Sequence, residues 1–317
     1  MKKKIKPVDL KNIRTIPLSK RKNKVSLDRL ARVYDSRHGN FSDFILSMPK
    51  FLVADDLRSL VDDIVRSYKK NKPVIVMAGA HVIKVGLSPL IIDLIKNGVV
   101  KAIAINGATV IHDVELAMWG NTSEDVEENI QNGSFGMSKE TGEFINGILK
   151  SEINNDGCGF GEAMGKALQQ APHKNISILA ACVKYKIPVT VHVGIGTDII
   201  HQQPSMDGSI TGEMKFRDFR LFCGVVQQLI NGGVVLNFGS AVILPEVFLK
   251  ALTVARNLGA NARGFTTANF DMIQHYRPRV NVVQRPTKNS GKGYMFTGHH
   301  EIMIPLLCAS IKNRLGS

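Results

Sequence analysis

The sequence predicts an α/β protein built on a doubly wound, mostly parallel sheet. Short, continuous apolar runs such as PVIVMAGA (73–80) and VVKAIAINGA (99–108) are typical of strands that helices cover on both faces. Helical patterns alternate with these runs, as right-handed crossovers between parallel strands require. Each run also ends in small or polar residues, which indicates that the carboxyl ends of the strands line a shared crevice.

Four further strands are expected along the chain. They are IPVTVHVGIG (187–196), GGVVLNFGSA (232–241), ARGFTTANFD (262–271) and GYMFTG (293–298). Helices are predicted between them, and a last helix follows in HHEIMIPLLCASIKNRL. A polar, glycine-rich middle, residues 121–160, separates the first two strands from the other four.

Three segments are expected in the chain. Residues 1–24 form a basic arm and residues 25–70 a helical extension, and residues 71–317 form the α/β domain. The extension ends in ADDLRSLVDDIVRSYKK, which has apolar residues at helical spacing, acids early and lysines late, as the helix dipole favours.

Composition narrows the class of protein. The chain is 44% hydrophobic and 21% charged, as in soluble globular proteins, and no apolar run approaches the ~20 residues of a membrane helix. The four cysteines are far apart and form no CxxC pair, and the basic start lacks the apolar segment of a secretory signal. We therefore expect a cytoplasmic protein with no membrane partner.

The net charge of +14 is concentrated at the N-terminus. Residues 1–24 hold ten Lys or Arg and one acid, which is +9, so the remaining chain carries about +5. Such an arm can bind nucleic acid or an acidic partner, or dock on its own oligomer. With 6% aromatic residues and no recognisable nucleic-acid module in the body, the sequence does not favour nucleic acid as a partner.

Three titratable residues follow the second predicted strand within INGATVIHDVELAMWG (105–120). His112, Asp113 and Glu115 stand where a loop passes into a helix. In one interpretation His112 and Asp113 orient each other, with the imidazole as a general base at near-neutral pH. In the other, Asp113 caps the helix and His112 points to solvent.

The glycine-rich strand ends suggest a loop-lined site for the phosphates of a dinucleotide. The strict GxGxxG fingerprint is missing, because GIGTDI has Gly194 and Gly196 but Ile199 at the third glycine position.

The blocks VIVMAGAHVIKVG, AIAINGATVIHDVE, VVLNFGSAVILPE, GFTTANFD and YMFTGHHEIMIPLL resemble, in order and spacing, the NAD-binding blocks of deoxyhypusine synthase. The likeness covers roughly residues 70–312 and implies a Rossmann-like domain that binds NAD at the subunit interfaces of a homotetramer. The implied NAD-binding residues are Gly79, Ala80, His81, Asn106, Gly107, Ala108, Asp198, Gly239, Ser240, Ala241, Thr266, Thr267 and His299. Asp198 equally suits a simple turn.

The stretch INGATVIHDVELAMWGNTS is also similar to a loop in the ornithine cyclodeaminase domain of certain arginine-degrading enzymes. The His112–Asp113 pair is closer to that branch than to the synthase, which has glutamates there. This resemblance implies acid–base groups at the rim of a nicotinamide site.

The sequence departs from the synthase at its catalytic lysine. The synthase carries an imine on a lysine in a WGK-type motif, whereas the single tryptophan here, Trp119, lies elsewhere. Lys292, between two glycines, is the candidate Schiff-base lysine, with Lys288 near it; the alternative is a surface lysine in a turn.

The expected substrate pocket also differs from the acidic spermidine pocket of the synthase. This region of the sequence is basic instead: the stretch HYRPRVNVVQRPTK contains Arg277, Arg279 and Arg285, which suit the binding of a carboxylate or phosphate group. With Asn269 and Asp271, Arg277 and Arg279 are the predicted substrate contacts. No HxH or HExxH spacing supports a metal site.

The sequence thus predicts an NAD-dependent enzyme, of the transferase or lyase type, that oxidises a C–N bond of an amine or amino acid to an imine. The imine then reacts with water, a second amine or an internal nitrogen. Ornithine cyclodeaminase-type loss of ammonia is one alternative, and a non-catalytic NAD-binding protein with a basic arm for RNA or an acidic partner is another.

Overall fold

The computed structural model of the chain describes residues 4–316. The chain divides into two units at Ala54 and Asp55, each of which is described by itself. The first unit contains three short turns of 3-10 helix, η1 (Leu10–Asn12), η2 (Leu18–Lys20) and η3 (Leu27–Arg29), and the helix α1 (Phe41–Ser47). Asn40 begins α1 with a capping box, in which its side chain accepts from Asp43 N at 3.1 Å.

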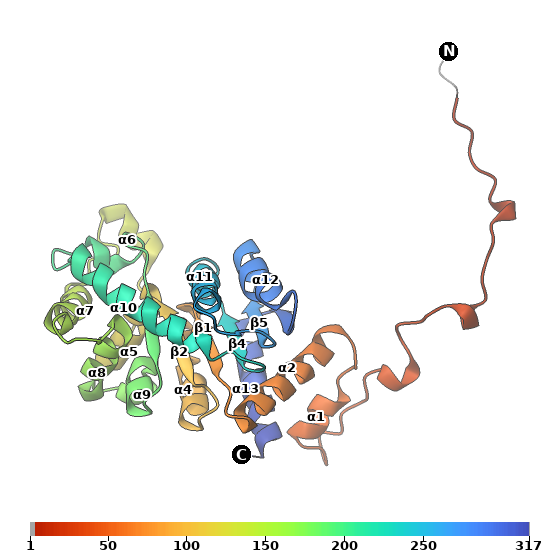
Figure 1. Ribbon diagram of the computed structural model, residues 1–317, viewed down its shortest axis with the longest axis horizontal. Helices are drawn as coiled ribbons and strands as arrows, with labels where there is room; N and C mark the ends of the chain where they lie inside the picture. Colours follow the sequence, from red (N-terminus) through yellow and green to blue (C-terminus); the bar gives the residue numbers. More distant parts are fainter. Residues whose placement is uncertain (1–3, 317) are drawn as a thin grey trace. The chain divides into compact units, whose positions relative to one another are not determined.

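The second unit is a six-stranded parallel sheet, which confirms the predicted fold class (Figure 1). The strand order is β3-β2-β1-β4-β5-β6, so the direction of winding reverses between β1 and β4. The strands are β1 (Val74–Ala78), β2 (Ala102–Asn106), β3 (Val189–His192), β4 (Val234–Phe238), β5 (Thr266–Asp271) and β6 (Lys292–Thr297).

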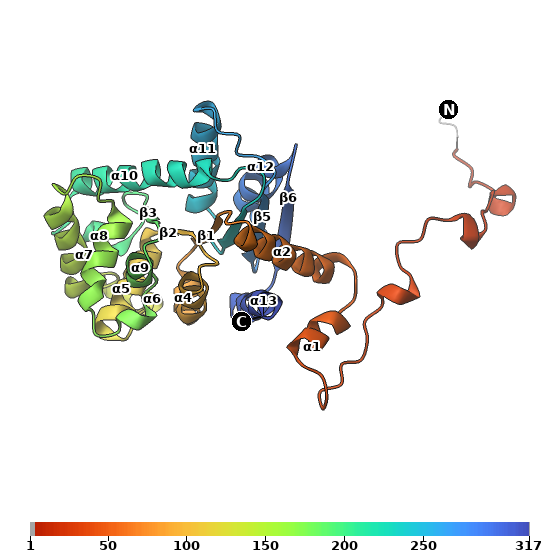
Figure 2. The same cartoon turned by 60° about the horizontal axis from the view of Figure 1, so that its bottom comes forward.

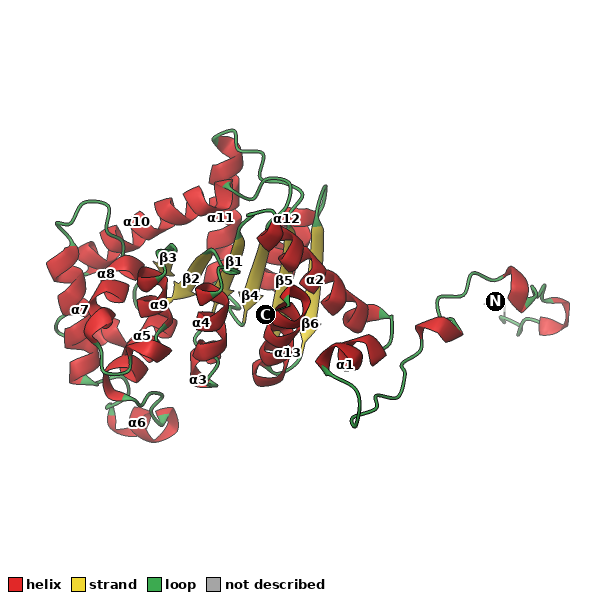
Figure 3. Ribbon diagram, turned by 90° about the horizontal axis from the view of Figure 1, so that it is seen from below, coloured by secondary structure: helices red, strands yellow, loops and turns green. Residues whose placement is uncertain are grey.

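Helices cover both faces of the sheet (Figures 2 and 3). One face carries α10 (Gly208–Gln227), α11 (Ile243–Asn257) and the segment of η7 (Pro278–Gln284) and α12 (Arg285–Thr287). The hydrophobic core on this side joins β1, β2 and β4 to α10 and α11. The other face carries α4 (Ser88–Lys96), α5 (Gly107–Trp119), α9 (Ile178–Lys184) and α13 (His300–Leu315).

The remaining elements surround this frame. They are α2 (Leu52–Lys69), α3 (His81–Lys84), α6 (Val126–Asn132), α7 (Lys139–Glu152), α8 (Phe160–Ala167), η4 (Leu168–Gln170), η5 (Lys174–Ile176) and η6 (Ile199–Gln202). None of the helices in residues 4–316 combines the length and the apolar character that a membrane crossing needs.

The helix α5 starts earlier than the sequence pattern suggests. The Asn106 side chain accepts from Thr109 N at 2.9 Å, so the last residue of β2 is also the N-cap of α5. Because no loop intervenes, His112 and Glu115 lie on one face of a regular helix, three residues apart.

The glycine-rich middle is more ordered than its composition indicates, since it contains α6 and α7. In α7 the buried side is a stripe of Thr141, Ile145 and Leu149 that includes Gly142. A Cβ at Gly142 would lie 2.6 Å from Gln203 Cγ. Gly142 interrupts the helical pattern in the sequence, but it allows Gln203 to pack closely against α7.

A buried carboxylate fastens the edge strand β3 to its helices. Asp218, in the middle of α10, accepts from Val191 N at 2.7 Å and from Gly161 N, near the start of α8, at 2.9 Å. Burial raises the pKa of Asp218 to about 8, against the opposing effect of these two hydrogen bonds.

We predict that Asp218→Asn removes part of the pH dependence of stability. Because burial raises the pKa in the folded state to about 8, the folded chain holds this proton more tightly than the unfolded chain does. The contribution is complete below about pH 4 and is lost as pH rises through about 8, at roughly 1.4 kcal/mol per pH unit. Urea unfolding of both proteins from pH 5 to 8 measures it, and parallel curves would contradict the prediction.

Candidate functional site

A cavity of about 320 Å³ opens at the carboxyl ends of β2 and β3. Its walls come from α5, α6, the end of α3 and the loop that leads from β3 into η6. The lining residues are Lys84, Ala108, Ile111, His112, Glu115, Ser123, Glu124, Val126, Phe135, Ser138, Thr197, Asp198 and Ile199. Its volume is at the lower end of the range for small-molecule sites.

His112 and Glu115 are joined through a hydroxyl group. Thr122 Oγ1 donates to Glu115 Oε2 and lies 2.6 Å from His112 Nδ1. Thr141 Oγ1 donates to the other oxygen, Glu115 Oε1, at 3.0 Å. Since the Thr122 proton goes to Glu115, we assign the His112 proton to Nδ1, which leaves a lone pair on Nε2.

The imidazole of His112 is held in its neutral form. Burial and, to a smaller extent, the charge of Lys84 together lower the pKa of His112 to about 4. At neutral pH the ring therefore presents one hydrogen-bond donor, to Thr122, and one acceptor.

Asp198 lies over the first turn of α5. Its side chain is 7% exposed, and its Oδ2 has no hydrogen-bond partner among the described residues. A Cβ at Gly107 would lie 2.1 Å from this oxygen, so only glycine fits at the first position of α5. Burial raises the pKa of Asp198 to about 6, although Thr197 and the Ala108 N–H lower it.

The charges of the cavity favour a cationic ligand. Three carboxylates, Glu115, Glu124 and Asp198, face one lysine, Lys84, and a neutral His112. Glu124 is held in place by Gly136 N and Asn129 Nδ2, each at 2.9 Å. Lys84, which is exposed, offers one position for an anionic group at the rim.

Asp113 turns away from His112 and performs a structural task. It is 1% exposed and accepts from Ser177 Oγ at 2.6 Å, Ile178 N at 2.9 Å and Leu179 N at 3.1 Å. These are donors at the start of α9, so Asp113 caps a neighbouring helix and not its own. Glu115 takes the place beside His112 that we expected Asp113 to take.

The expected lysine and threonine pair lie at the opposite end of the sheet. Thr266 and Lys292 are the first residues of β5 and β6, and both bind the buried carboxylate of Asp63, in α2. Thr267 is fully buried within β5. The resemblance implied that these threonines bind NAD, whereas they lie at the start of β5, which ends at Asp271 as the sequence pattern predicts.

The predicted substrate contacts do not line the cavity. Asn269 is fully buried and accepts from Asn237 Nδ2 at 2.7 Å, so it joins β4 to β5. Asp271, at the end of β5, is buried and accepts from Met272 N. Arg277 pairs with Glu246 at 3.5 Å, and Arg279 is exposed, so the arginines do not form one pocket.

The remaining predicted cofactor residues lie near the carboxyl ends of β1 and β4, between which the direction of winding reverses. Gly79 and Gly239 are in backbone contact: Gly79 N donates to Phe238 O at 2.9 Å, and a Cβ at Gly79 would lie 2.7 Å from Gly239 O. The small residues Ala80, Ser240 and Ala241 follow these two glycines in the sequence. The ring of His81 is tilted by 55° against that of the buried His300, with centroids 5.4 Å apart, and His299 is exposed at the start of α13.

The predicted cofactor residues differ in how they suit a phosphate. At the ends of β1 and β4, Gly79 is in contact with Gly239, and a Cβ at Gly239 would lie 2.5 Å from His300 Cε1, so the ring of His300 lies against this glycine. The first turn of α5, which Asn106, Gly107 and Ala108 form, already holds the carboxylate of Asp198, and that carboxylate repels a phosphate. Of the predicted cofactor residues, those at the start of α5 are therefore the less suited to the phosphates of NAD.

Comparison with known proteins establishes the fold. No family model and no curated protein matches the sequence. Solved structures that match include ArgZ, an arginine dihydrolase from the ornithine–ammonia cycle in Cyanobacteria (TM-score 0.51, 16% identity, 81% of this chain and 31% of that chain). A ternary complex of AgrE with ornithine and NAD⁺ also matches (TM-score 0.52, 12% identity, 82% and 33%).

A candidate deoxyhypusine synthase from Entamoeba histolytica matches over most of both chains (TM-score 0.51, 12% identity, 88% of this chain and 96% of that chain). The chain spans only about a third of the ArgZ and AgrE chains, 31% and 33%. At these identities the matches show a common fold with the two groups of proteins that the sequence motifs resemble.

Several site residues were not predicted from the sequence. Lys84 ends α3, whereas Thr122 and Glu124 lie in the loop that follows α5, and only the fold brings these two segments to the same site. For Glu115 a signal exists, because it follows His112 at the three-residue spacing that places side chains on one helix face.

We predict that His112 remains neutral, with its proton on Nδ1, at pH 6, because burial holds its pKa at about 4. Nuclear magnetic resonance of the labelled imidazole nitrogens measures both properties. In Thr122→Val the Nδ1 proton loses its acceptor, so the tautomer preference should weaken, whereas Thr197→Val, in the same cavity, should preserve it. A charged ring at pH 6 would contradict this assignment.

Proposed function

We propose that the chain is an NAD-dependent enzyme that binds an amine or amino acid in the cavity at the ends of β2 and β3 and oxidises its C–N bond. The observation that carries the proposal is the unpartnered Asp198 Oδ2, in a cavity where three carboxylates face one lysine. A buried carboxylate with a free lone pair favours a ligand that brings an N–H donor and a positive charge.

The residues of the cavity suit the binding of an amino acid with a second amine. The ammonium group donates to Asp198 Oδ2 and lies within the field of Glu115 and Glu124. Lys84, at the rim, pairs with the carboxylate. His112 Nε2 accepts a further N–H bond from the amine and fixes its orientation, since Thr122 and Glu115 fix the ring.

Asp198 is the better proton acceptor of the two titratable groups. An amine must lose a proton before its carbon gives up a hydride, and a base is most effective when its pKa lies near the working pH. Burial raises the pKa of Asp198 to about 6, whereas burial lowers that of His112 to about 4. We therefore assign the proton transfer to Asp198 and positioning of the amine to His112.

The chemistry that NAD supplies when bound is acceptance of the hydride, which converts the amine to an imine. Gly79, Ala80, Gly239, Ser240 and Ala241 would hold it at the ends of β1 and β4. AgrE, a protein of this fold, has been solved with ornithine and NAD⁺, which supports the choice of cofactor and of an amino-acid substrate.

An aminobutyl transfer of the synthase type is the second candidate, supported by the fold match to the candidate deoxyhypusine synthase. It requires a lysine that forms an imine, and Lys292 lies at the amino end of β6, paired with Asp63 at 3.2 Å. Loss of ammonia from the imine, as in a cyclodeaminase, needs no lysine. The expected homotetramer stays a prediction, which light scattering tests.

We expect L-ornithine to bind more tightly than putrescine, which lacks the carboxylate that Lys84 pairs with. Affinity should rise as pH increases through about 6, because Asp198 becomes ionised there and attracts the ammonium group. Asp198→Asn should weaken binding by roughly tenfold and flatten this pH profile.

Calorimetric titration measures each affinity. Asp156→Asn, a change of an exposed carboxylate outside the cavity, is the matched control. Equal affinity of the Asp198→Asn and wild-type proteins for every amine tested would show that this cavity is not the amine site.

We predict that Lys292→Met leaves ammonia release from ornithine in the presence of NAD unchanged. The lost pair with Asp63 is half exposed, so the free energy of unfolding should fall by about 1 kcal/mol or less. Ammonia release is measured by a coupled assay, and stability by thermal unfolding. Abolished turnover in a folded variant would favour aminobutyl transfer through this lysine.

A further inference from the structure

A second hollow, of about 490 Å³, lies between α10 and α11 where these helices meet the end of β3. The two helices pack side by side on the sheet face opposite to α5 (Figures 1 and 3). We call it the α10–α11 groove, and its lining residues are His192, Ile195, Gly212, Lys215, Phe216, Phe219, Glu246, Val247 and Lys250. The proposed amine cavity shares none of these residues.

The inner wall of the groove includes His192, whose ring packs against Phe222 with centroids 5.4 Å apart and has one unpartnered nitrogen among the described residues. His192, the last residue of β3, is fully buried, and its Nε2 lies 3.0 Å from Thr190 Oγ1. Thr190 Oγ1 in turn donates to Ile103 O, so Nε2 carries the proton. Nδ1 then has a lone pair, with no partner among the described residues. A buried acceptor of this kind favours a ligand that brings an N–H or O–H donor.

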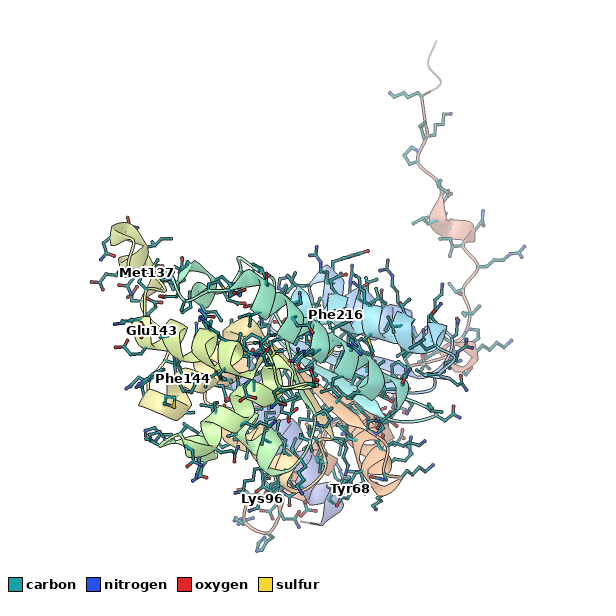
Figure 4. The ribbon with its side chains drawn as sticks, turned by 60° about the vertical axis from the view of Figure 1, so that its left-hand side comes forward. Tyr68, Lys96, Met137, Glu143, Phe144 and Phe216 are labelled. Carbon is teal, nitrogen blue, oxygen red and sulfur yellow. The ribbon has the colours of Figure 1, made fainter. Side chains whose placement is uncertain are left out.

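The side walls of the groove are apolar and aromatic. Phe216 and Phe219 are stacked, with ring centroids 6.4 Å apart and an interplanar angle of 22°. Phe216 is 54% exposed although it is large and apolar, and Figure 4 shows it on the outer side of α10. Val247 and Ile195 complete this surface. Such walls suit a planar ring, which can stack on Phe216.

The rim of the groove carries excess positive charge. Glu246 is neutralised by Lys250 and Arg277 and also accepts from Asn281 Nδ2 at 2.7 Å. Lys215 has no ion-pair partner within residues 4–316, and its charge contributes to lowering the pKa of His192 to about 3, after the larger effect of burial. Lys215 therefore lies near the imidazole and is free to pair with an anionic group.

We propose that the α10–α11 groove binds a planar heteroaromatic anion, whose ring N–H donates to His192 Nδ1, whose face stacks on Phe216, and whose anionic group pairs with Lys215. Indole carboxylates and nucleoside monophosphates whose base has a ring N–H, such as IMP, both have this chemistry, so two probes distinguish the sources. The proposal is independent of the amine site.

The first experiment is calorimetric titration of the protein, residues 1–317, with indole carboxylate and with IMP. Each has a matched analogue: N-methylindole carboxylate lacks the ring N–H, and inosine lacks the anion. We expect at least one probe to bind with a submillimolar dissociation constant and its analogue to bind about tenfold more weakly. Binding of indole carboxylate alone identifies an aromatic carboxylate, and binding of IMP alone identifies a nucleotide.

Variants then locate the site without disturbing the buried histidine. Lys215→Gln and Phe216→Ala change surface positions and should each weaken the bound probe about tenfold. Lys96→Gln, at the end of α4 and far from Phe216 in Figure 4, is the matched control and should bind normally. Asp198→Asn should also bind the probe normally. The titrations of the groove therefore test this proposal independently of the proposed amine site.

Three outcomes overturn the proposal. One is no binding of either probe at millimolar concentration. Another is equal binding of a probe and its analogue, which removes the role of His192 or of Lys215. The last is binding that Lys215→Gln and Phe216→Ala leave unchanged. If the first outcome occurs together with a self-association of the protein that Phe216→Ala abolishes, the groove is a contact between copies of the chain.

Discussion

The direct passage from β2 into α5 is the constraint on which the candidate site depends. Asn106 ends the strand and caps the helix with the same side chain, through Thr109 N at 2.9 Å. The helix phase is therefore set by the sheet, and positions along α5 have fixed directions. His112 and Glu115, three residues apart, face the cavity, whereas Asp113, about 100° further round, faces α9.

Three buried carboxylates illustrate how burial and hydrogen bonding compete. Asp113 and Asp218 each accept two backbone N–H bonds, and each joins elements that are distant in the sequence. Asp198 and Asp218 each have one oxygen without a hydrogen-bond partner among the described residues, and Asp198 lines the cavity at the ends of β2 and β3. Burial raises the pKa of all three.

The loop after β3 separates the two hollows. Asp198 at its far end lines the proposed amine cavity, and Ile195 together with His192 lines the α10–α11 groove. Because β3 is the edge strand, this loop is not enclosed by a further strand, and its glycines, including Gly196 with φ of +92°, allow it to turn sharply between the two faces.

The sequence by itself determined the fold class and the position of every strand to within a few residues. The physical reason is that strands buried on both faces must be continuously apolar, as VIVMA and VVLNF are. The sequence also identified the segment that holds His112, and Asp198, as parts of a candidate site. The reason is that small residues between an apolar run and a helix mark the carboxyl end of a strand, where ligands bind.

Only the tertiary structure decided which of these residues meet. The resemblance placed Thr266 and Thr267 in the cofactor site, but the register of β5 with β4 makes Thr266 the strand's first residue, at the opposite end from the cavity. The sequence suggested Asp113 as the partner of His112. Its position on α5 instead turns its side chain to Ser177, 64 positions away in the sequence. Nothing in the sequence links Lys84 to Thr122 and Glu124, since the proximity of Lys84 to their loop results from the packing of two segments around one end of a sheet.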